Sequence, residues 1–128
     1  MLPSDHPLAG CEHVDLSDLA EQPIVSFPPN SSSVLRASTE KMCEAAGFRP
    51  RFVQSAPDSY TIHALVAAGV GVSLTVSSCL HIQQPGVVYL PIRNPSIALS
   101  SALAWNIDNP SPAVQSVLRV AETVLPHL

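Results

Sequence analysis

The sequence has few charged residues and few cysteines. Only 12% of its 128 residues are Asp, Glu, Lys or Arg, whereas 46% are apolar. This composition excludes a solvated, disordered segment and predicts one small domain that buries a core without disulfides. The three cysteines are widely spaced and odd in number. They define no disulfide framework and indicate reduced thiols in a cytoplasmic protein.

Basic side chains are scarce as well. The formal net charge is −4, and the six Lys and Arg residues are scattered apart from Arg49 and Arg51, which flank Pro50. A grip on a nucleic-acid backbone needs clustered basic residues, so this segment is not expected to bind DNA by itself. The Arg49–Arg51 pair is interpreted as a solvated loop, with attraction of anions as the alternative.

Long apolar runs and targeting signals are missing too. No segment reaches the roughly 18 uninterrupted apolar residues of a membrane span. The first residues lack the basic head and apolar stretch of a signal peptide. The sequence therefore predicts a cytoplasmic protein with no membrane segment.

The motifs of common enzymes and metal sites are absent. Gly69-Val70-Gly71 only begins a dinucleotide motif, because Leu74 stands where the third glycine belongs. Neither G-x-x-x-x-G-K-[ST] nor G-x-S-x-G occurs. Cys11-Glu12-His13 is a possible but weak ligand pair, and His63 is interpreted as a helix residue rather than a ligand. Neither catalysis, nor a metal, nor a cofactor is predicted.

An alternation of strand and helix patterns is present instead. Strands are predicted at residues 23–27, 51–54, 70–76, 87–92 and 97–105. Helices are predicted from Val34 to Gly47, from Ser59 to Gly69 and from Pro112 onward, with short turns near residues 16–20 and 77–84. The order β-α-β-α-β-β-β-α predicts an α/β fold with a largely parallel sheet.

Capping residues and periodicity set the expected helices. Gly47 and Gly69 stand where helices end in the left-handed region, and Asp58 or Ser59 is expected to cap the second helix. On the first helix, Leu35, Thr39, Met42 and Ala46 are expected on one side. On the second, Ile62, Leu65, Val66 and Gly69 share a face. Ser111 and Pro112 begin the last helix, whose apolar stripe is Val114, Val117, Leu118, Ala121, Val124 and Leu125.

The candidate site follows from this topology, because ligands of parallel sheets bind at the carboxyl ends of the strands. The residues expected at this rim are Pro28, Asn30, Ser31, Ser32, Ser33, Gln54, Ser55 and Ser59. Backbone N–H groups at a helix start, together with hydroxyls, suit a carboxylate. Capping needs only one of the four residues Asn30–Ser33, so ligand contact and pure capping both remain open.

Six segments stand in a characteristic order and spacing: LPSDHPLA (2–9), LSDLAEQPIVSFP (16–28), EAAGFRPRFVQ (44–54), LVAAGVGVSL (65–74), GVVYLPI (86–92) and SALAW (101–105). Together they resemble the effector-binding domain of LysR-type bacterial transcriptional regulators. The resemblance covers essentially the whole chain, although no single segment is highly specific.

The resemblance implies a type 2 periplasmic-binding-protein-like fold with a mixed, mostly parallel sheet flanked by helices, and an effector cleft between two subdomains. Residues 1–22 would end subdomain I, 23–100 would form subdomain II, and 101–128 would return to subdomain I. Met1 would be an internal start, and DNA would be bound only through an N-terminal winged helix-turn-helix that the chain lacks. Effector contacts would fall on the Pro28–Ser33 turn, Val53–Ser55 and Ser59–Tyr60, in a homodimer or tetramer.

The main hypothesis is therefore an effector-sensing domain for a small organic anion. The alternative is a free-standing small-molecule-binding protein of the same fold. That alternative is disfavoured because export would require a signal peptide. An enzyme on this scaffold is disfavoured by the missing catalytic motifs.

Overall fold

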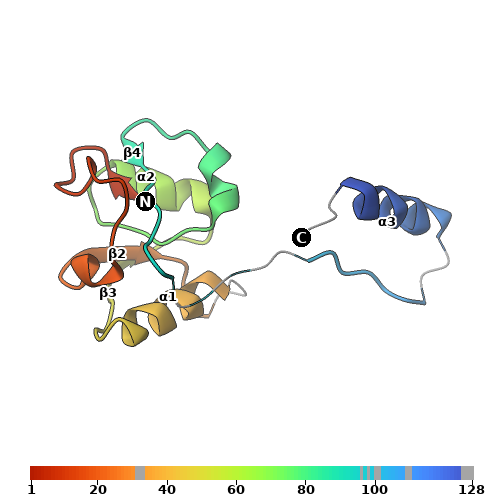
Figure 1. Cartoon of the computed structure of the whole chain (residues 1–128), viewed down its shortest axis with the longest axis horizontal. Coiled ribbons are helices and arrows are strands. Elements are labelled where there is room, and N and C mark those ends of the chain that lie inside the picture. Colours follow the sequence, from red (N-terminus) through yellow and green to blue (C-terminus); the bar gives the residue numbers. More distant parts are fainter. Residues whose placement is uncertain (31–33, 96, 98, 100–101, 109–110, 125–128) are drawn as a thin grey trace. The chain divides into compact units, whose positions relative to one another are not determined.

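The computed structural model describes residues 1–30, 34–95, 97, 99, 102–108 and 111–124. The chain forms two compact units, Met1–Ile97 and Ala98–Leu128 (Figure 1). The expected subdomain boundaries at residues 22 and 100 stay predictions. Within the first unit, residues 1–22 contribute the strand β1 (Leu2–Pro3) and the 3₁₀ helix η1 (Leu16–Leu19).

A β-α-β unit forms the centre of the first unit. Strand β2 (Pro23–Ser26) leads through helix α1 (Val34–Ala45) to strand β3 (Arg51–Ser55). The two strands pair in parallel, with a register shift after Ile24. These three elements confirm the first strand, helix and strand predicted from the sequence. They also set which residues share the carboxyl edge of the sheet.

The strand expected at residues 70–76 pairs at one residue only, so that prediction is wrong in its extent. Val72 bridges Ile24 in parallel. The Val25 amide donates to the Val72 carbonyl oxygen at 2.8 Å, and the Val72 amide donates to the Pro23 carbonyl oxygen at 2.8 Å. β-Branched composition favours an extended backbone, but a ladder also needs a partner of matching length. Here β2 offers only four residues.

The remaining strands of the first unit are short. β1 pairs antiparallel with β4 (Val87–Val88), and the Ser73 amide donates to the Met1 carbonyl oxygen at 3.0 Å. The strand expected at residues 87–92 thus shrinks to two residues, while Ile92 forms a separate parallel bridge with Val14. Pro91 has no amide hydrogen and cannot donate to a ladder. Parallel and antiparallel pairings together give the mixed arrangement that was expected.

Successive residues of β2 point to opposite faces, and each face has its own core. Ile24 packs with the buried side chains Leu2, Val14, Leu19, Cys43 and Val72. Val25 packs on the other face with Ala56 and Ile62. Figure 1 shows α1 and α2 (Ser59–Ala67) on different sides of β2 and β3. The strands therefore lie between helices, as an α/β fold requires.

Helix α2 begins and ends where the sequence predicts. The Asp58 carboxylate accepts from the Thr61 amide at 2.9 Å, which identifies Asp58 as the cap. Gly69 follows the helix with φ +74°, in the left-handed region that glycine enters without a Cβ clash. Ile62 and Val66 are buried and Leu65 is half-buried, as the helical spacing predicted, but Gly69, the fourth residue expected on this face, is exposed beyond the end of the helix.

The buried face of α1 differs from the predicted one in part. Thr39 and Met42 are buried as expected, but Ala46 is exposed and Cys43 is fully buried. The helix ends at Ala45, so Ala46 no longer belongs to its inner face. Burial raises the pKa of the Cys43 thiol to about 11. This cysteine is therefore an apolar core residue, protonated at neutral pH.

The second unit contains helix α3 (Pro112–Val124), which confirms the predicted final helix. None of its described side chains is buried. A strand was expected at residues 97–105. Residues 97, 99 and 102–105 lie in no strand, so the prediction is wrong there. The other residues of this range fall outside the described residues. Leu125 of the apolar stripe also falls outside them.

Across the described ranges no helix, including the 3₁₀ helix η2 (Ser77–His81), has the length and apolar character to cross a bilayer.

Candidate functional site

Parallel pairing brings the carboxyl ends of β2 and β3 together. Val25 lies opposite Gln54 and Ser26 lies opposite Ser55. The pairing continues one residue further, because the Ala56 amide donates to the Ser26 carbonyl oxygen at 3.1 Å. Pro28 and Asn30 belong to the segment that follows β2 after Phe27. The segments that carry Pro28, Asn30, Gln54 and Ser55 therefore leave the sheet at one edge, which we call the rim.

The first residues of α2 follow β3 after a short turn. Ser59 is half-buried, whereas Tyr60 is 72% exposed. Asn30, Gln54 and Ser55 are exposed as well. Within the described part of the chain, the side chains of Asn30, Gln54, Ser55 and Tyr60 make no hydrogen bond. Their polar groups are free to meet a ligand at the rim.

Three predicted site residues, Ser31, Ser32 and Ser33, lie outside the described residues. The choice between ligand contact and helix capping at these hydroxyls thus stays a prediction. Their sequence neighbourhood is still informative. Residues 27–39 contain no Asp or Glu, so the positive end of the α1 dipole meets no acidic side chain of its own.

The start of α2 differs from that of α1, because an acidic residue already occupies it. The two Asp58 oxygens accept from the Thr61 amide and from the Thr61 hydroxyl, each at 2.9 Å. The Thr61 amide, followed by its hydroxyl, holds the pKa of Asp58 below the usual range for Asp. This ionised carboxylate disfavours a second anion at α2. Of the two helix starts near the rim, α1 is the more favourable for an anionic ligand.

Sequence reasoning missed Arg36 as a residue of the rim. Its Nε lies 2.8 Å from the Glu40 carboxylate, and its Nη1 donates to the Phe27 carbonyl oxygen at 3.3 Å. Its guanidinium carbon lies 3.2 Å from the centroid of the Phe52 ring. The i, i+4 spacing to Glu40 could have indicated the ion pair. The contacts with Phe27 and Phe52 depend on tertiary structure.

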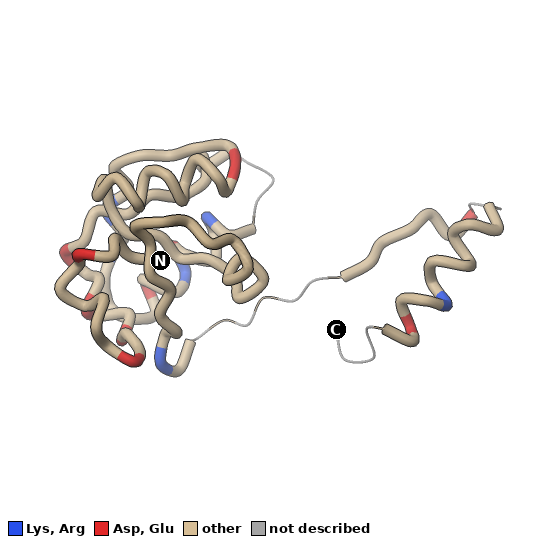
Figure 2. The backbone as a smooth tube through the Cα atoms, turned by 90° about the horizontal axis from the view of Figure 1, so that it is seen from above, with Lys and Arg blue, Asp and Glu red and all other residues tan. Residues whose placement is uncertain are grey.

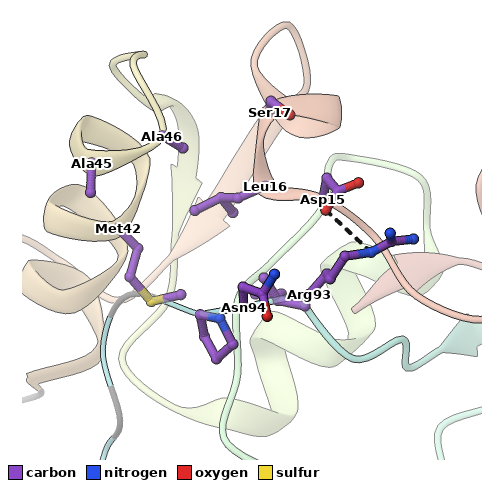
Figure 3. Close-up of a pocket in the computed structure, with 10 residues that line it drawn as sticks. Asp15, Leu16, Ser17, Met42, Ala45, Ala46, Arg93 and Asn94 are labelled. Carbon is purple, nitrogen blue, oxygen red and sulfur yellow. Dashed lines mark ion pairs between the residues drawn. The ribbon is translucent and has the colours of Figure 1, made fainter.

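A separate pocket of about 270 Å³ lies at the other end of α1 (Figure 3). Residues 15–17 and 92–95 line it together with Met42, Ala45 and Ala46. The Arg93 guanidinium and the Asp15 carboxylate, both half exposed, approach to 3.5 Å at this pocket. None of the predicted site residues that the structure describes lines it. No sequence pattern predicts this pocket, because the pocket depends on the long-range pairing of Val14 with Ile92.

His63 is a buried core residue, not a ligand at the rim. Its side chain is 1% exposed, and its Nδ1 lies 2.5 Å from the Ser59 carbonyl oxygen. Its Nε2 has no hydrogen-bond partner in the described structure, and its ring centroid lies 5.9 Å from that of Tyr89. Over the described residues, no three His, Cys, Asp or Glu side chains gather to hold a metal ion. The weak Cys11–His13 ligand pair thus gains no third ligand there.

Basic residues lie on several different elements of the chain. Arg36 and Lys41 lie on α1, Arg51 on β3 and Arg119 on α3, and Figure 2 shows the Lys and Arg positions in blue along the backbone. Arg93 is paired with Asp15.

Comparisons with known proteins agree with this architecture. The transcriptional regulator ShiR of Corynebacterium glutamicum (strain R) is 41% identical over 121 residues, which cover 94% of this chain and 41% of ShiR. The BenM effector-binding domain with its effector benzoate is 26% identical, with a TM-score of 0.67 over 74% of this chain and 44% of that one. The effector-binding domain of QuiR in complex with shikimate, 22% identical, has the same fold, with a TM-score of 0.72 over 99% of this chain and 60% of that one.

These likenesses confirm the periplasmic-binding-protein-like fold that the resemblance implied. The chain spans about two fifths of the length of the curated relatives it matches, which are transcriptional regulators. The profile of the LysR substrate binding domain matches residues 1–126. The chain therefore belongs to the LysR substrate-binding domain family.

Proposed function

We propose that this chain senses a small organic anion for a LysR-type transcriptional regulator, and that the anion binds at the rim. The observation that carries the proposal is the convergence of the β2 and β3 carboxyl ends, with Gln54 and Ser55 exposed beside the turn that begins at Pro28. In parallel sheets this edge is the usual ligand site.

The charge pattern favours a carboxylate as the ligand. The first turn of α1 carries no acidic side chain, and the exposed Asn30 amide before it offers a hydrogen-bond donor. Asp58 already occupies the α2 start. The BenM domain, a structural relative at 26% identity, holds benzoate as its effector. A ring carboxylate of similar size is therefore the first ligand to test.

The rim is suited to binding rather than to catalysis. Asp58 lies beside the rim, and its hydrogen bond from the Thr61 amide lowers its pKa. A general acid or base working at neutral pH needs a pKa near that pH. Asp58 is also committed to Thr61 as a helix cap. We therefore infer that the chain is not an enzyme.

The wider context of the proposal comes from the family. DNA contact would belong to a winged helix-turn-helix outside these 128 residues, and the protein would act in the cytoplasm as a homodimer or tetramer. Residues 23–100, the expected subdomain II, would supply one wall of the effector cleft.

The proposal is tested by calorimetric titration of the 128-residue chain with benzoate and with shikimate. We expect a carboxylate to bind, and the Asn30→Ala, Gln54→Ala double variant to bind it at least roughly tenfold more weakly. That factor follows because a hydrogen bond to a charged group contributes about 1.5–3 kcal/mol.

Arg93→Ala is the matched control, because it removes a polar side chain at the other end of α1. It should leave the affinity unchanged. If Arg93→Ala weakens binding while the rim variant does not, the ligand occupies the Arg93 pocket and the proposed site is wrong. If the wild-type chain binds neither carboxylate, the proposed function is wrong.

A further inference from the structure

Arg36 joins three segments that meet at the rim. It projects from the first turns of α1, stacks on Phe52 of β3 and donates to the carbonyl oxygen of Phe27, the first residue after β2. Its side chain is only 15% exposed. One guanidinium thus connects α1, β3 and the start of the turn that leads to Asn30.

The turn after β2 needs such a connection. Strand pairing ends at Ser26, and α1 is described from Val34, so Phe27–Asn30 belong to neither element. Pro28 and Pro29 have no amide hydrogen to donate. Phe52 lies two residues before Gln54 on β3. The contacts of Arg36 therefore act on both rim segments at once.

Arg36 is better placed to hold the protein than to meet a ligand. One face of the guanidinium covers the Phe52 ring, and Nε is paired with Glu40, which neutralises its charge. A planar guanidinium can stack and donate in a fixed fork at the same time, whereas the ammonium of lysine is a point charge on a flexible stem. Shape, and not charge alone, is what this position requires.

We propose that Arg36 is a positioning residue for effector binding, which fixes the Phe27–Asn30 turn against β3 so that its polar groups face the ligand in one conformation. This inference rests on the proposed function. It predicts that replacing Arg36 with lysine, which keeps the positive charge but removes the guanidinium, loosens the turn and also weakens ligand binding.

The test compares Arg36→Lys with Glu40→Gln in the 128-residue chain. Glu40→Gln removes the ion pair but leaves the Phe52 stack and the Phe27 hydrogen bond, so it is the matched control. Backbone ¹⁵N relaxation reports the order of the Phe27 and Asn30 amides without ligand. In Arg36→Lys we expect their order parameters to fall from about 0.85 toward 0.6, and in Glu40→Gln to stay unchanged.

Titration with benzoate and shikimate completes the test. We expect Arg36→Lys to bind whichever carboxylate the wild type binds about tenfold more weakly, and Glu40→Gln to bind it within about threefold of the wild type. Weaker binding with an unchanged turn would mean that Arg36 contacts the ligand directly and would overturn the positioning role. Unchanged affinity overturns it too, whatever the turn does. Absence of binding by the wild-type chain overturns the proposed function itself, and with it the role of Arg36 at a ligand site.

Discussion

At the scale of single residues, Gly71 shows how closely two backbones approach in this fold. A Cβ atom at Gly71 would lie 2.4 Å from the Pro23 carbonyl oxygen and 3.3 Å from a Val25 methyl carbon. The neighbouring Val72 amide donates to that same Pro23 oxygen. Only a residue without a side chain lets Val72 lie this near β2. Gly71 is thus required for packing and not for holding a phosphate.

Gly71→Ala should therefore destabilise the protein by about 1–3 kcal/mol, because the added methyl group overpacks against backbone that cannot move aside. Urea unfolding followed by circular dichroism measures this loss. Gly10→Ala is the matched control, since nothing lies within 4 Å of its Cβ position, and it should change stability by less than about 0.5 kcal/mol. Equal stability of the two variants would show that the close approach at Pro23 is relieved without cost.

At the scale of elements, the two residues that delimit α2 stabilise its ends, and one of them, Asp58, also places a negative charge near the rim. Asp58 satisfies the Thr61 amide at the start, and Gly69 closes the other end with φ +74°. Both ends rest on local chemistry, which is why the sequence predicted them. The charge of Asp58 also leaves α1 as the helix start that favours an anion.

Asp58→Ala should lower the thermal midpoint by a few degrees at pH 7, and Asp58→Asn by less, because asparagine still caps. The pKa of Asp58 is lowered in the folded protein, so the ionised carboxylate stabilises the fold above its unfolded value of about 3.9. That contribution is lost as the pH falls through the lower folded value. In thermal scans, the difference in thermal midpoint between the wild type and Asp58→Asn should shrink as the pH falls below about 4. A difference that stays constant from pH 7 to pH 2 would exclude a role of the charge.

Strand length was predicted less well than helix ends, for a physical reason. Val70–Val76 has strand composition, yet Val72 alone pairs, because the number of ladder bonds depends on a partner distant in the sequence. The Arg36–Phe52 stack and the Asp15–Arg93 ion pair are likewise long-range contacts that no local pattern encodes. The rim could be predicted because parallel topology alone brings the ends of β2 and β3 together.

At the scale of the whole molecule, the two units differ in how their helices are stabilised. In the first unit, α2 buries Ile62, His63 and Val66. In the second, α3 has 13 residues and no buried described side chain, with Val117, Val120 and Val124 at least 60% exposed. A helix of about 12–15 residues is only marginally stable in water without tertiary packing. We therefore expect α3 to be less protected than α2.

Hydrogen exchange tests this difference directly. At low protein concentration, we expect the α3 amides to exchange at least roughly a hundredfold faster than those of Ile62 and Val66, because local opening of α3 exposes no core. If a second copy covers the apolar face of α3, as the proposed homo-oligomer allows, exchange in α3 should slow as concentration rises while α2 stays unchanged. Protection of α3 equal to that of α2 at every concentration would contradict the expectation. It would mean that α3 is held as firmly as the core of the first unit, without help from a second chain.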